Sequence, residues 1–350
     1  MYEGQTIGVV IPAYNEEGFV GDVIRELPAY VDRIYVVDDC STDGTWEEVV
    51  EAAREDSARS TEYAPDRAIA PDGGTSALTE RAIPHDAVGR VVPIQHRSNR
   101  GAGGAIKTGY LAAVEDRMDV TVTVDADGQM DLAQMRRLLE PIVDGRADYA
   151  KGNRLLSREY REAMPRFRLF GNSILTFLTK IASGYWKTMD PQNGYTAISH
   201  EALCAVDVES LYEYYGYCNE LLVRLNASGM RVADVAMPAV YGEEESSIEY
   251  TTYIRKVSWM LLSNFLWRLR EKYLVRDFHP LALFYLFGAG TATLGVFSAF
   301  WLLFAWASPI GSTLLSGETS LLVFITGSVL VLFAMVFDMQ ENEHRELQVQ

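Results

Sequence analysis

Two long apolar stretches near the C-terminal end most constrain what this chain can fold into. Leu281–Ala307 is a run of 27 residues without Asp, Glu, Lys, Arg or His, and Thr319–Phe337 is a second such run of 19. About 20 apolar residues in a helix cross the ~30 Å hydrocarbon core of a bilayer, so each run is long enough to span a membrane. The sequence therefore predicts a transmembrane helical hairpin over residues 281–337. A helical hairpin buried inside a soluble protein is the alternative.

The segment before the first run carries most of the positive charge of this region. Residues 250–280 contain six basic and two acidic side chains, with aromatic residues such as Trp259 and Trp267 between them. A basic, Trp-bearing amphipathic segment is typical of a helix lying on anionic lipid, so we expect interfacial helices over residues 249–280. A solvated helix on the domain surface is the alternative.

The distribution of basic residues also predicts an orientation in the membrane. Residues 308–318 contain no basic side chain, and only Arg345 follows the second apolar run. The positive-inside rule then places both ends of the chain in the cytoplasm, including a cytoplasmic tail over residues 338–350. Residues 1–17 show no basic region followed by an apolar stretch, so we expect no signal peptide. We expect a multi-pass cell-membrane protein with a cytoplasmic catalytic part.

The overall charge excludes some partners. The chain has 48 acidic and 31 basic residues, a net charge of −17, and only six of the basic residues are Lys. A nucleic-acid binder is expected to have the opposite balance, so we expect no nucleic-acid partner. An acid-rich surface suits a halophilic protein, since concentrated salt screens its self-repulsion. The three cysteines have no metal-ligand spacing and are expected to be free thiols.

The first 250 residues repeat a strand, a polar loop and a helix. Thr6 to Ile11 is a short apolar strand that we expect Pro12 to stop, and Arg33 to Val37 is the next strand, with Ser41 or Thr42 as the cap of the following helix. This rhythm predicts an α/β domain with a mostly parallel sheet over residues 1–248, in which ligands bind at the carboxyl ends of the strands. Residues 57–88 lack an apolar period, and we expect a mobile surface insertion there.

Two carboxylates follow the strand that we expect at the centre of the sheet. Val120 to Val124 alternates Val and Thr and runs directly into Asp125 and Asp127. Like charges this close are unfavourable unless a cation lies between them, and carboxylate oxygens suit Mg²⁺ or Mn²⁺. A polar turn after a strand is the alternative, because Asp and Gly are common turn residues.

A glycine-rich loop lies between another strand and helix, at residues 99–105. Its pattern is G-A-G-G-A rather than G-x-G-x-x-G, and it lies in the third strand–helix unit, so a nicotinamide-dependent dehydrogenase is disfavoured. The glycines would still permit a close approach of the backbone to a phosphate or a sugar.

Four motifs together resemble a known family. VVIPAYNEE at residues 9–17, VVDDCSTDGT at 36–45, NRGAGGAIKTGY at 99–110 and DADGQ at 125–129 occur in the order found in the inverting family-2 glycosyltransferases of GT-A fold. The subgroup most similar to this chain is the polyprenyl-phosphate hexosyltransferases, which include dolichyl-phosphate mannose and glucose synthases. KGNR at 151–154, RFRLFGN at 166–172 and the two apolar runs fit that subgroup.

The resemblance implies a role for individual residues. It implies that the nucleotide is lined by Pro12, Tyr14, Glu16, Val37 and Asp39, with Asp39 facing the base. It implies that Asp125, Asp127 and Gln129 hold the metal, and that Ala126 contacts the donor through its backbone. Arg154 and Arg168 would bind the acceptor phosphate, with Arg166 competing for the second role. A surface ion pair is the alternative for each arginine.

The implied reaction is the metal-dependent, inverting transfer of one hexose from a UDP- or GDP-sugar to a polyprenyl (dolichyl) phosphate at the cytoplasmic face. It would feed glycan assembly such as protein N-glycosylation. A lipid phosphate is ionised at neutral pH and needs no general base, only cations such as Arg to hold it. No Q-x-x-R-W stretch of the processive synthases is present, which favours a single transfer.

Two other functions stay open at this point. A transferase that extends a lipid-linked oligosaccharide at a sugar hydroxyl would require a carboxylate base, for which Glu220 is the candidate. A non-catalytic, membrane-anchored nucleotide-sugar binder is the second. Two features depart from the subgroup: KGNR replaces the more familiar G-S-R, and the 57–88 insertion has no counterpart. A homo-oligomer through Gly288, Gly290 and Gly295 of the first span is a further expectation.

The charge balance generates one prediction. If the acidic surface is adapted to concentrated salt, the thermal unfolding midpoint of the protein should fall when salt is lowered from about 2 M to about 0.05 M, because screening of like charges is lost. Equal midpoints in the two buffers would contradict the halophile hypothesis.

Overall fold

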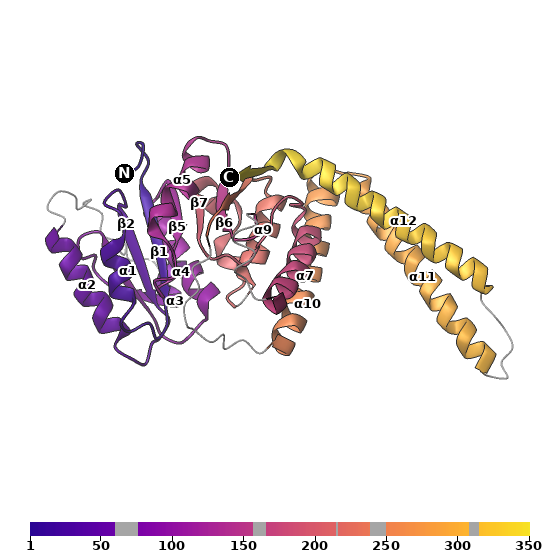
Figure 1. Ribbon diagram of the computed structural model, residues 1–350, viewed down its shortest axis with the longest axis horizontal. Coiled ribbons are helices and arrows are strands. Elements are labelled where there is room, and N and C mark those ends of the chain that lie inside the picture. The colour runs from indigo at the N-terminus through magenta and orange to yellow at the C-terminus, as the bar shows by residue number, and fades with distance from the viewer. Residues whose placement is uncertain (60–75, 157–165, 215, 239–249, 308–314) are drawn as a thin grey trace.

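The computed structural model describes residues 1–59, 76–156, 166–214, 216–238, 250–307 and 315–350, without the side chains of 166–170, 250–254 and 307. Within these residues, nine strands form one sheet in the order β3-β4-β2-β1-β5-β7-β6-β8-β9 (Figure 1). Five of the eight pairings are parallel, and the three that involve β3 or β7 are antiparallel. The expected mostly parallel α/β sheet is therefore confirmed. The strands are β1 (Ile7–Ala13), β2 (Arg33–Asp38), β3 (Ala82–Pro84), β4 (Val91–His96), β5 (Val120–Thr123), β6 (Tyr149–Asn153), β7 (Thr196–Ser199), β8 (Val232–Ala236) and β9 (Glu346–Val349).

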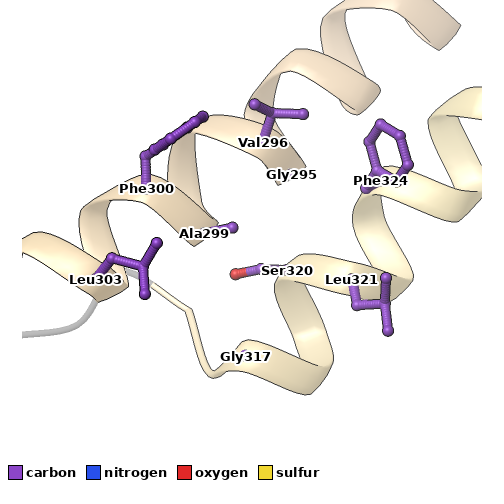
Figure 2. Close-up of a pocket in the computed structure, with 9 residues that line it drawn as sticks. All are labelled: Gly295, Val296, Ala299, Phe300, Leu303, Gly317, Ser320, Leu321 and Phe324. Atoms are coloured by element: carbon purple, nitrogen blue, oxygen red, sulfur yellow. The ribbon is translucent and has the colours of Figure 1, made fainter.

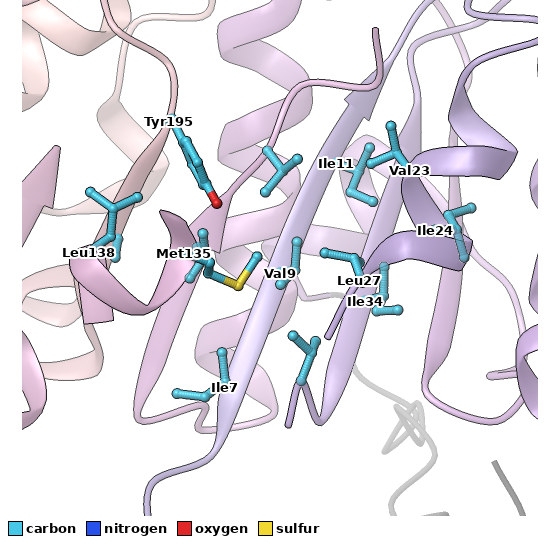
Figure 3. Close-up of a cluster of buried hydrophobic side chains, with 14 of the residues drawn as sticks. Ile7, Val9, Ile11, Val23, Ile24, Leu27, Ile34, Met135, Leu138 and Tyr195 are labelled. Carbon is cyan, nitrogen blue, oxygen red and sulfur yellow. The ribbon is translucent and has the colours of Figure 1, made fainter. Parts of the chain in front are cut away.

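Helices cover both faces of the sheet. Alternate residues of a strand point to opposite faces, so Ile7, Val9 and Ile11 of β1 pack with α1 (Val20–Glu26) and α5 (Met135–Val143), as Figure 3 shows. The same face is covered by α2 (Thr45–Arg59), and η1 (Leu132–Gln134) precedes α5. The opposite face is covered by α3 (Ala77–Arg81), α4 (Ala102–Glu115), α8 (His200–Ala205), η2 (Val208–Ser210) and α9 (Tyr217–Ala227).

Pro12 does not stop the first strand, contrary to expectation. The Val10 carbonyl points towards β5 and accepts the Val124 N–H. Pro12 lies two residues further along the strand, so its nitrogen also points towards β5. Because β5 ends at Thr123, no residue of β5 lies opposite this nitrogen, and the missing N–H of proline removes no hydrogen bond between the two strands. Strand β1 therefore continues to Ala13, beside Asp38 of β2.

The 57–88 insertion is more regular than expected. Helix α2 continues to Arg59, and after residues 60–75, which lie outside the described part of the chain, α3 and β3 follow. Leu78 of α3 is fully buried, and β3 pairs antiparallel with β4 at the edge of the sheet. Both ends of the stretch therefore belong to the domain.

Two long helices, α11 (Leu281–Ala307) and α12 (Gly317–Asn342), project from the body of the protein as a hairpin (Figure 1). Both are long and apolar enough to cross a membrane, and only 17% of the most apolar window of each is buried. A hairpin buried inside a soluble protein would be covered by other elements, so the structure does not support that alternative. The second helix extends past the expected end at Phe337.

The segment before the hairpin does not lie free on a surface. Helix α10 (Tyr250–Arg270) packs on α7 (Arg166–Ser183) and α9, where Val257 and Leu261 are buried. Trp259 on another face of α10 is 72% exposed, which agrees with the expected amphipathic character. Arg268, which the charge count assigned to a lipid-facing surface, is fully buried, so that part of the expectation is wrong.

A buried polar cluster attaches the hairpin to the domain. Arg268 and Asp338 of α12 form an ion pair of 2.7 Å with neither side chain exposed, and the Tyr273 hydroxyl donates to the same carboxylate at 2.7 Å. Lys272, in the π-helical turn η3 (Glu271–Arg276), donates to Asn226 of α9 at 2.8 Å. Removing one partner of such a pair leaves a buried charge at a cost of about 3–5 kcal/mol, so the cluster strongly favours this docking.

The C-terminal segment is not the separate tail that the sequence predicted. Residues 338–342 complete α12, the turn η4 (Glu343–Arg345) follows, and β9 then pairs in parallel with β8. Figure 1 shows the C-terminal end back at the sheet, close to β6. The hairpin is thus inserted between two parts of one domain.

Two of the three glycines expected to pack between protomers are used within the hairpin. A Cβ on Gly288 would lie 2.9 Å from the Val331 nitrogen, and one on Gly295 would lie 2.5 Å from the Phe324 nitrogen. Only Gly290, of these three, has nothing within 4 Å. Towards the open end, the two helices leave an apolar groove of about 300 Å³ beside Gly295 and Ser320 (Figure 2).

This packing predicts the effect of two substitutions. A Cβ on Gly327 would lie 2.2 Å from the Ala292 nitrogen, so Gly327→Leu should force the helices apart and lower the free energy of unfolding by about 2 kcal/mol or more. Gly290→Leu is the matched control and should change it little. Denaturant unfolding of the purified protein in detergent measures both, and equal effects of the two changes would contradict the packing.

Candidate active site

A cavity of about 160 Å³ lies at the carboxyl end of β5. Four of the residues predicted for the site from the sequence line it together: Asp125, Asp127, Gln129 and Arg154. The structure thus brings the acidic pair and one predicted arginine into one space, although they follow different strands, β5 and β6. The remaining lining residues are Met130, Asp131, Gln134, Gln192, Asn193, Gly194, Tyr195, Met237 and Pro238.

The acidic pair is held by a tight local turn. The Asp127 carboxylate accepts the Gln129 N–H at 2.9 Å, and Gly128 between them has a φ of +70°, a conformation that favours glycine. Gly194 lies against the other carboxylate, since a Cβ there would be 3.2 Å from the Asp125 Oδ2 atom. The Ala126 side chain is buried in the core, so only its backbone faces the turn.

The donor set of this turn fits a hard divalent cation. Asp125, Asp127 and Gln129 supply only oxygen ligands on the side chains that face the cavity. The described residues contain no cluster of three or more His, Cys, Asp or Glu side chains suited to a metal. Mg²⁺ is commonly held by one or two carboxylates plus substrate phosphates, so a two-carboxylate site fits a cation that binds together with a diphosphate.

Arg154 is oriented by a buried carboxylate, Asp190. The Arg154 Nε atom donates to Asp190 at 2.7 Å and Nη2 at 2.9 Å, which makes the pair bidentate. Burial acts to raise the pKa of Asp190, but the bonds and charge of Arg154, with Lys151 nearby, hold that pKa below its ordinary value. Asp190 is therefore an ionised anchor whose backbone has a φ of +48°, uncommon for a residue other than glycine.

The loops expected to contact the nucleotide are joined to each other. Asn15 donates its N–H to the Ser41 hydroxyl at 3.0 Å, and its side-chain oxygen accepts the Thr42 N–H at 2.9 Å. Neither Ser41 nor Thr42 caps α2 as expected, because the helix begins at Thr45, whose N–H bonds to Asp43. The polar residues after β2 serve instead to fix the loop after β1.

The predicted donor-binding residues differ in their exposure. Tyr14 is 47% exposed, and Pro12 and Glu16 are half-buried at the same edge of the sheet. The Val37 side chain is fully buried in the core, so only its backbone could face a ligand. Asp39 is buried.

Asp39 anchors the glycine-rich loop. Its carboxylate accepts the N–H groups of Arg100 at 2.8 Å and Gly101 at 2.7 Å, and it lies 2.6 Å from the His96 Nδ1 atom. Three partners therefore surround one carboxylate with 3% of its side chain exposed. Asp39 therefore has a structural role in holding the glycine-rich loop. That Asp39 faces the nucleotide base stays a prediction.

The glycine-rich loop packs against the chain itself. Gly104 donates its N–H to the Glu213 carbonyl at 2.8 Å, and a Cβ on Gly103 would lie 2.8 Å from that same backbone. The Glu213 carboxylate accepts from Arg81 at 2.6 Å and Lys107 at 3.1 Å. These two glycines therefore allow contact with residue 213, and the expectation of a phosphate or sugar against them is not supported.

Glu220, the candidate base of the alternative reaction, is occupied. One of its carboxylate oxygens accepts the Tyr212 N–H at 2.7 Å, and the other accepts from Arg224 at 3.0 Å. It is buried and is not among the residues that line the cavity, so it is neither a surface acid nor placed to act as a base there. The side chains of Arg166 and Arg168 lie outside the described residues.

The sequence interpretation missed the loop that forms the opposite wall. The pattern of residues 188–199 predicts a loop leading into a strand, and it indicates no role for Asp190, Asn193 or Gly194. The signal available was a carboxylate followed by P-Q-N-G between two apolar segments, which is typical of a tight turn. What the pattern could not indicate is that β7 runs antiparallel between β5 and β6, which carries this loop to the acidic pair.

Comparison with known proteins agrees with this geometry. A family model described as glycosyl transferase family 2 matches residues 8–206, and the chain belongs to this family. The protein is thus a glycosyltransferase with the α/β fold called GT-A. The expected family and fold are confirmed.

Two archaeal relatives are informative. The chain is 29% identical over 238 residues to a UDP-N-acetylglucosamine–dolichyl-phosphate N-acetylglucosaminyltransferase of Methanococcus voltae, covering 68% of this chain and 86% of the relative. It is 28% identical over 238 residues to a dolichyl-phosphate hexose transferase of Haloferax volcanii, covering 68% and 84%. A solved glucosyl-3-phosphoglycerate synthase of Mycobacterium tuberculosis matches with a TM-score of 0.48 at 18% identity over 76% of this chain and 80% of that one, which is too weak a similarity to carry an argument.

The Glu213 contacts predict a pH dependence. Burial acts to raise the pKa of Glu213, but Arg81 and Lys107 lower it to about 2 from 4.5. A carboxyl group whose pKa is lower in the folded protein than in the unfolded chain stabilises the fold at pH values above the unfolded pKa. This contribution is lost as the pH falls from about 4.5 towards 2. Over this pH range, the thermal unfolding midpoint of Glu213→Gln should therefore fall less steeply than that of the wild type. The midpoint of Glu209→Gln, a change at an exposed site, should fall as steeply as that of the wild type. Parallel curves for wild type and Glu213→Gln would contradict it.

Proposed function

We propose that the protein transfers one hexose from a nucleotide-diphosphate sugar to a polyprenyl phosphate at a membrane surface. The observation that carries this proposal is that Asp125, Asp127 and Arg154 line one cavity at the carboxyl end of β5. An acidic pair suited to a metal–diphosphate and an arginine suited to a phosphate are what the two substrates require. The archaeal relatives, named for transfer to dolichyl phosphate, support the acceptor class.

The reaction would be a single displacement with inversion. A phosphate oxygen of the lipid forms a bond to the anomeric carbon, and the bond from that carbon to the diphosphate oxygen breaks, with its electron pair leaving on the nucleotide diphosphate. The attacking phosphate is already ionised, so no proton has to be removed. The protein has to bind both anions and hold them in line.

Each side of the cavity would serve one anion. Mg²⁺ or Mn²⁺ held by Asp125, Asp127 and Gln129 would neutralise the charge that develops on the leaving diphosphate. Arg154 would bind the acceptor phosphate bidentately, since Asp190 fixes its guanidinium plane. Arg168 is the second arginine that we propose for the acceptor, with Arg166 as its competitor.

The donor would lie along the loops after β1 and β2. Pro12, Tyr14 and Glu16 would line the nucleotide with their side chains, and Val37 with its backbone. We propose that Asp39 acts at this side chiefly by holding the glycine-rich loop, because three groups already surround its carboxylate.

The arrangement of exposed apolar side chains supports a membrane-bound acceptor. Phe177 of α7 and Trp259 of α10 are 52% and 72% exposed, on helices that lie beside the base of the hairpin. Trp is enriched at membrane interfaces, and Trp and Phe are common on the apolar face of helices that lie there. We propose that α7 and α10 lie at the cytoplasmic surface while α11 and α12 span the bilayer, with the catalytic domain and both ends cytoplasmic.

The alternative functions are less well supported. Extension of a sugar hydroxyl needs a free carboxylate base, and both oxygens of Glu220 are bound to Tyr212 and Arg224. A non-catalytic binder would have no need of the ordered Arg154–Asp190 pair beside the acidic turn.

Removal of one carboxylate from the acidic turn is the first test. Asp127→Asn should lower kcat by at least about 100-fold, because a ligand to the metal on the leaving group is lost, and it should leave the thermal midpoint unchanged. Asp144→Asn, at a half-exposed surface site, is the matched control. The assay uses the full chain in vesicles with nucleotide sugar and bare polyprenyl phosphate, with chelator added in a parallel sample.

The product separates the proposed function from its alternatives. A lipid carrying one sugar, formed only with divalent metal, supports the proposal. No product without a preassembled glycolipid would favour the oligosaccharide-extending enzyme. Donor binding without turnover in every donor tested would favour the binding protein.

A further inference from the structure

The C-terminal strand β9 is bonded, mainly through the side chain of Glu346, to the segment that leads into the wall of the candidate site. One carboxylate oxygen accepts the Trp186 N–H at 2.9 Å, and the other accepts those of Lys187 at 2.6 Å and Thr188 at 2.9 Å. Gln348, two residues further along β9, donates to the Lys187 carbonyl at 3.1 Å. One carboxylate thus satisfies three consecutive backbone N–H groups, and such charge-assisted bonds are among the strongest in proteins.

The segment that Glu346 holds leads directly to the anchor of Arg154. Only Met189 separates Thr188 from Asp190, and the Met189 N–H donates to Asp234 of β8 at 2.7 Å. The ammonium group of Lys151 donates to the Met189 and Asp190 carbonyls, and it pairs with Asp234 at 2.9 Å. Strands β6, β8 and β9 therefore each hold one part of a segment that has no regular structure of its own.

The need for such support is visible at Asp190. Its φ of +48° is unfavourable for a residue with a side chain, and such a conformation persists only where the surroundings hold it. Asp190 also accepts the Arg154 backbone N–H at 3.1 Å, so a shift of this residue moves the arginine and its backbone together. Loosening residues 186–188 would therefore displace Arg154 indirectly, through Asp190.

We propose that Glu346 is a positioning residue for acceptor binding: from β9 it holds residues 186–190 in place, and through Asp190 it keeps Arg154 directed into the cavity. The inference rests on the proposed function, in which Arg154 binds the acceptor phosphate. Since only η4 lies between α12 and β9, the same contact connects the membrane hairpin to this arginine. The hairpin thereby has a role in the site in addition to anchoring.

The test uses the full-length protein in vesicles with polyprenyl phosphate and nucleotide sugar. Glu346→Gln keeps the side-chain length but replaces one acceptor oxygen by an NH₂ group that faces backbone N–H donors. We expect the KM for the lipid phosphate to rise about tenfold, with the KM for the nucleotide sugar nearly unchanged. Glu346→Asp retains the charge and should recover part of the loss.

Glu343→Gln is the matched control. This carboxylate lies three residues earlier and pairs with the exposed ammonium group of Lys187 at 3.1 Å, rather than with the backbone of the segment. It should leave both KM values as in the wild type. Hydrogen exchange provides a readout besides activity: the amides of residues 186–190 and of Gln192 should exchange at least tenfold faster in Glu346→Gln and at wild-type rates in Glu343→Gln.

The outcomes distinguish this inference from the proposed function. Unchanged exchange in a folded Glu346→Gln protein would overturn the inference whatever the kinetics. Faster exchange with an unchanged acceptor KM, in a protein where Arg154→Ala raises that KM, would also overturn it. If Arg154→Ala itself leaves the acceptor KM unchanged, the proposed role of Arg154 fails instead. Should Glu346→Gln not fold, Glu346→Asp tests the same claim through a smaller rise in the acceptor KM and faster exchange.

Discussion

The bidentate pair of Arg154 and Asp190 is the interaction on which the candidate site depends. A buried carboxylate is unfavourable unless it is paired and bonded, and Asp190 satisfies this condition through Arg154. The pair orients the guanidinium plane towards a cavity whose other wall carries two carboxylates. Cationic and anionic sides are thereby kept apart within one small space, which suits the two anionic substrates of the proposed reaction.

The same principle operates at the base of the hairpin. Arg268 of α10 and Asp338 of α12 are both fully buried and paired with each other, and their further partners come from α7, α9 and η3. Such a cluster is costly to form with any partner missing, so it favours one arrangement of the helices over alternatives. Together with β9, it makes the hairpin of α11 and α12 an insertion within the domain rather than an appended segment.

Much of the site could be predicted because its signals are local. A strand followed at once by Asp125 and Asp127 specifies both the edge of the sheet and its chemistry. The wall that contains Asp190 and Gly194 could not be predicted, because it depends on β7 running antiparallel in a mostly parallel sheet. The four residues of β9 alternate polar and apolar, but so short a pattern does not specify a partner, and the pairing with β8 joins segments more than 100 residues apart.

By itself, the sequence determined the α/β rhythm, the acidic turn and two helices able to span a membrane, since each follows from neighbouring residues. Only the tertiary structure decided which charged and small residues are available to a ligand or a partner. Arg268 and Glu220 are taken up by internal contacts, and Gly288 and Gly327 by the packing of two helices. The physical reason is that burial and pairing depend on long-range contacts, which residue type and spacing alone do not specify.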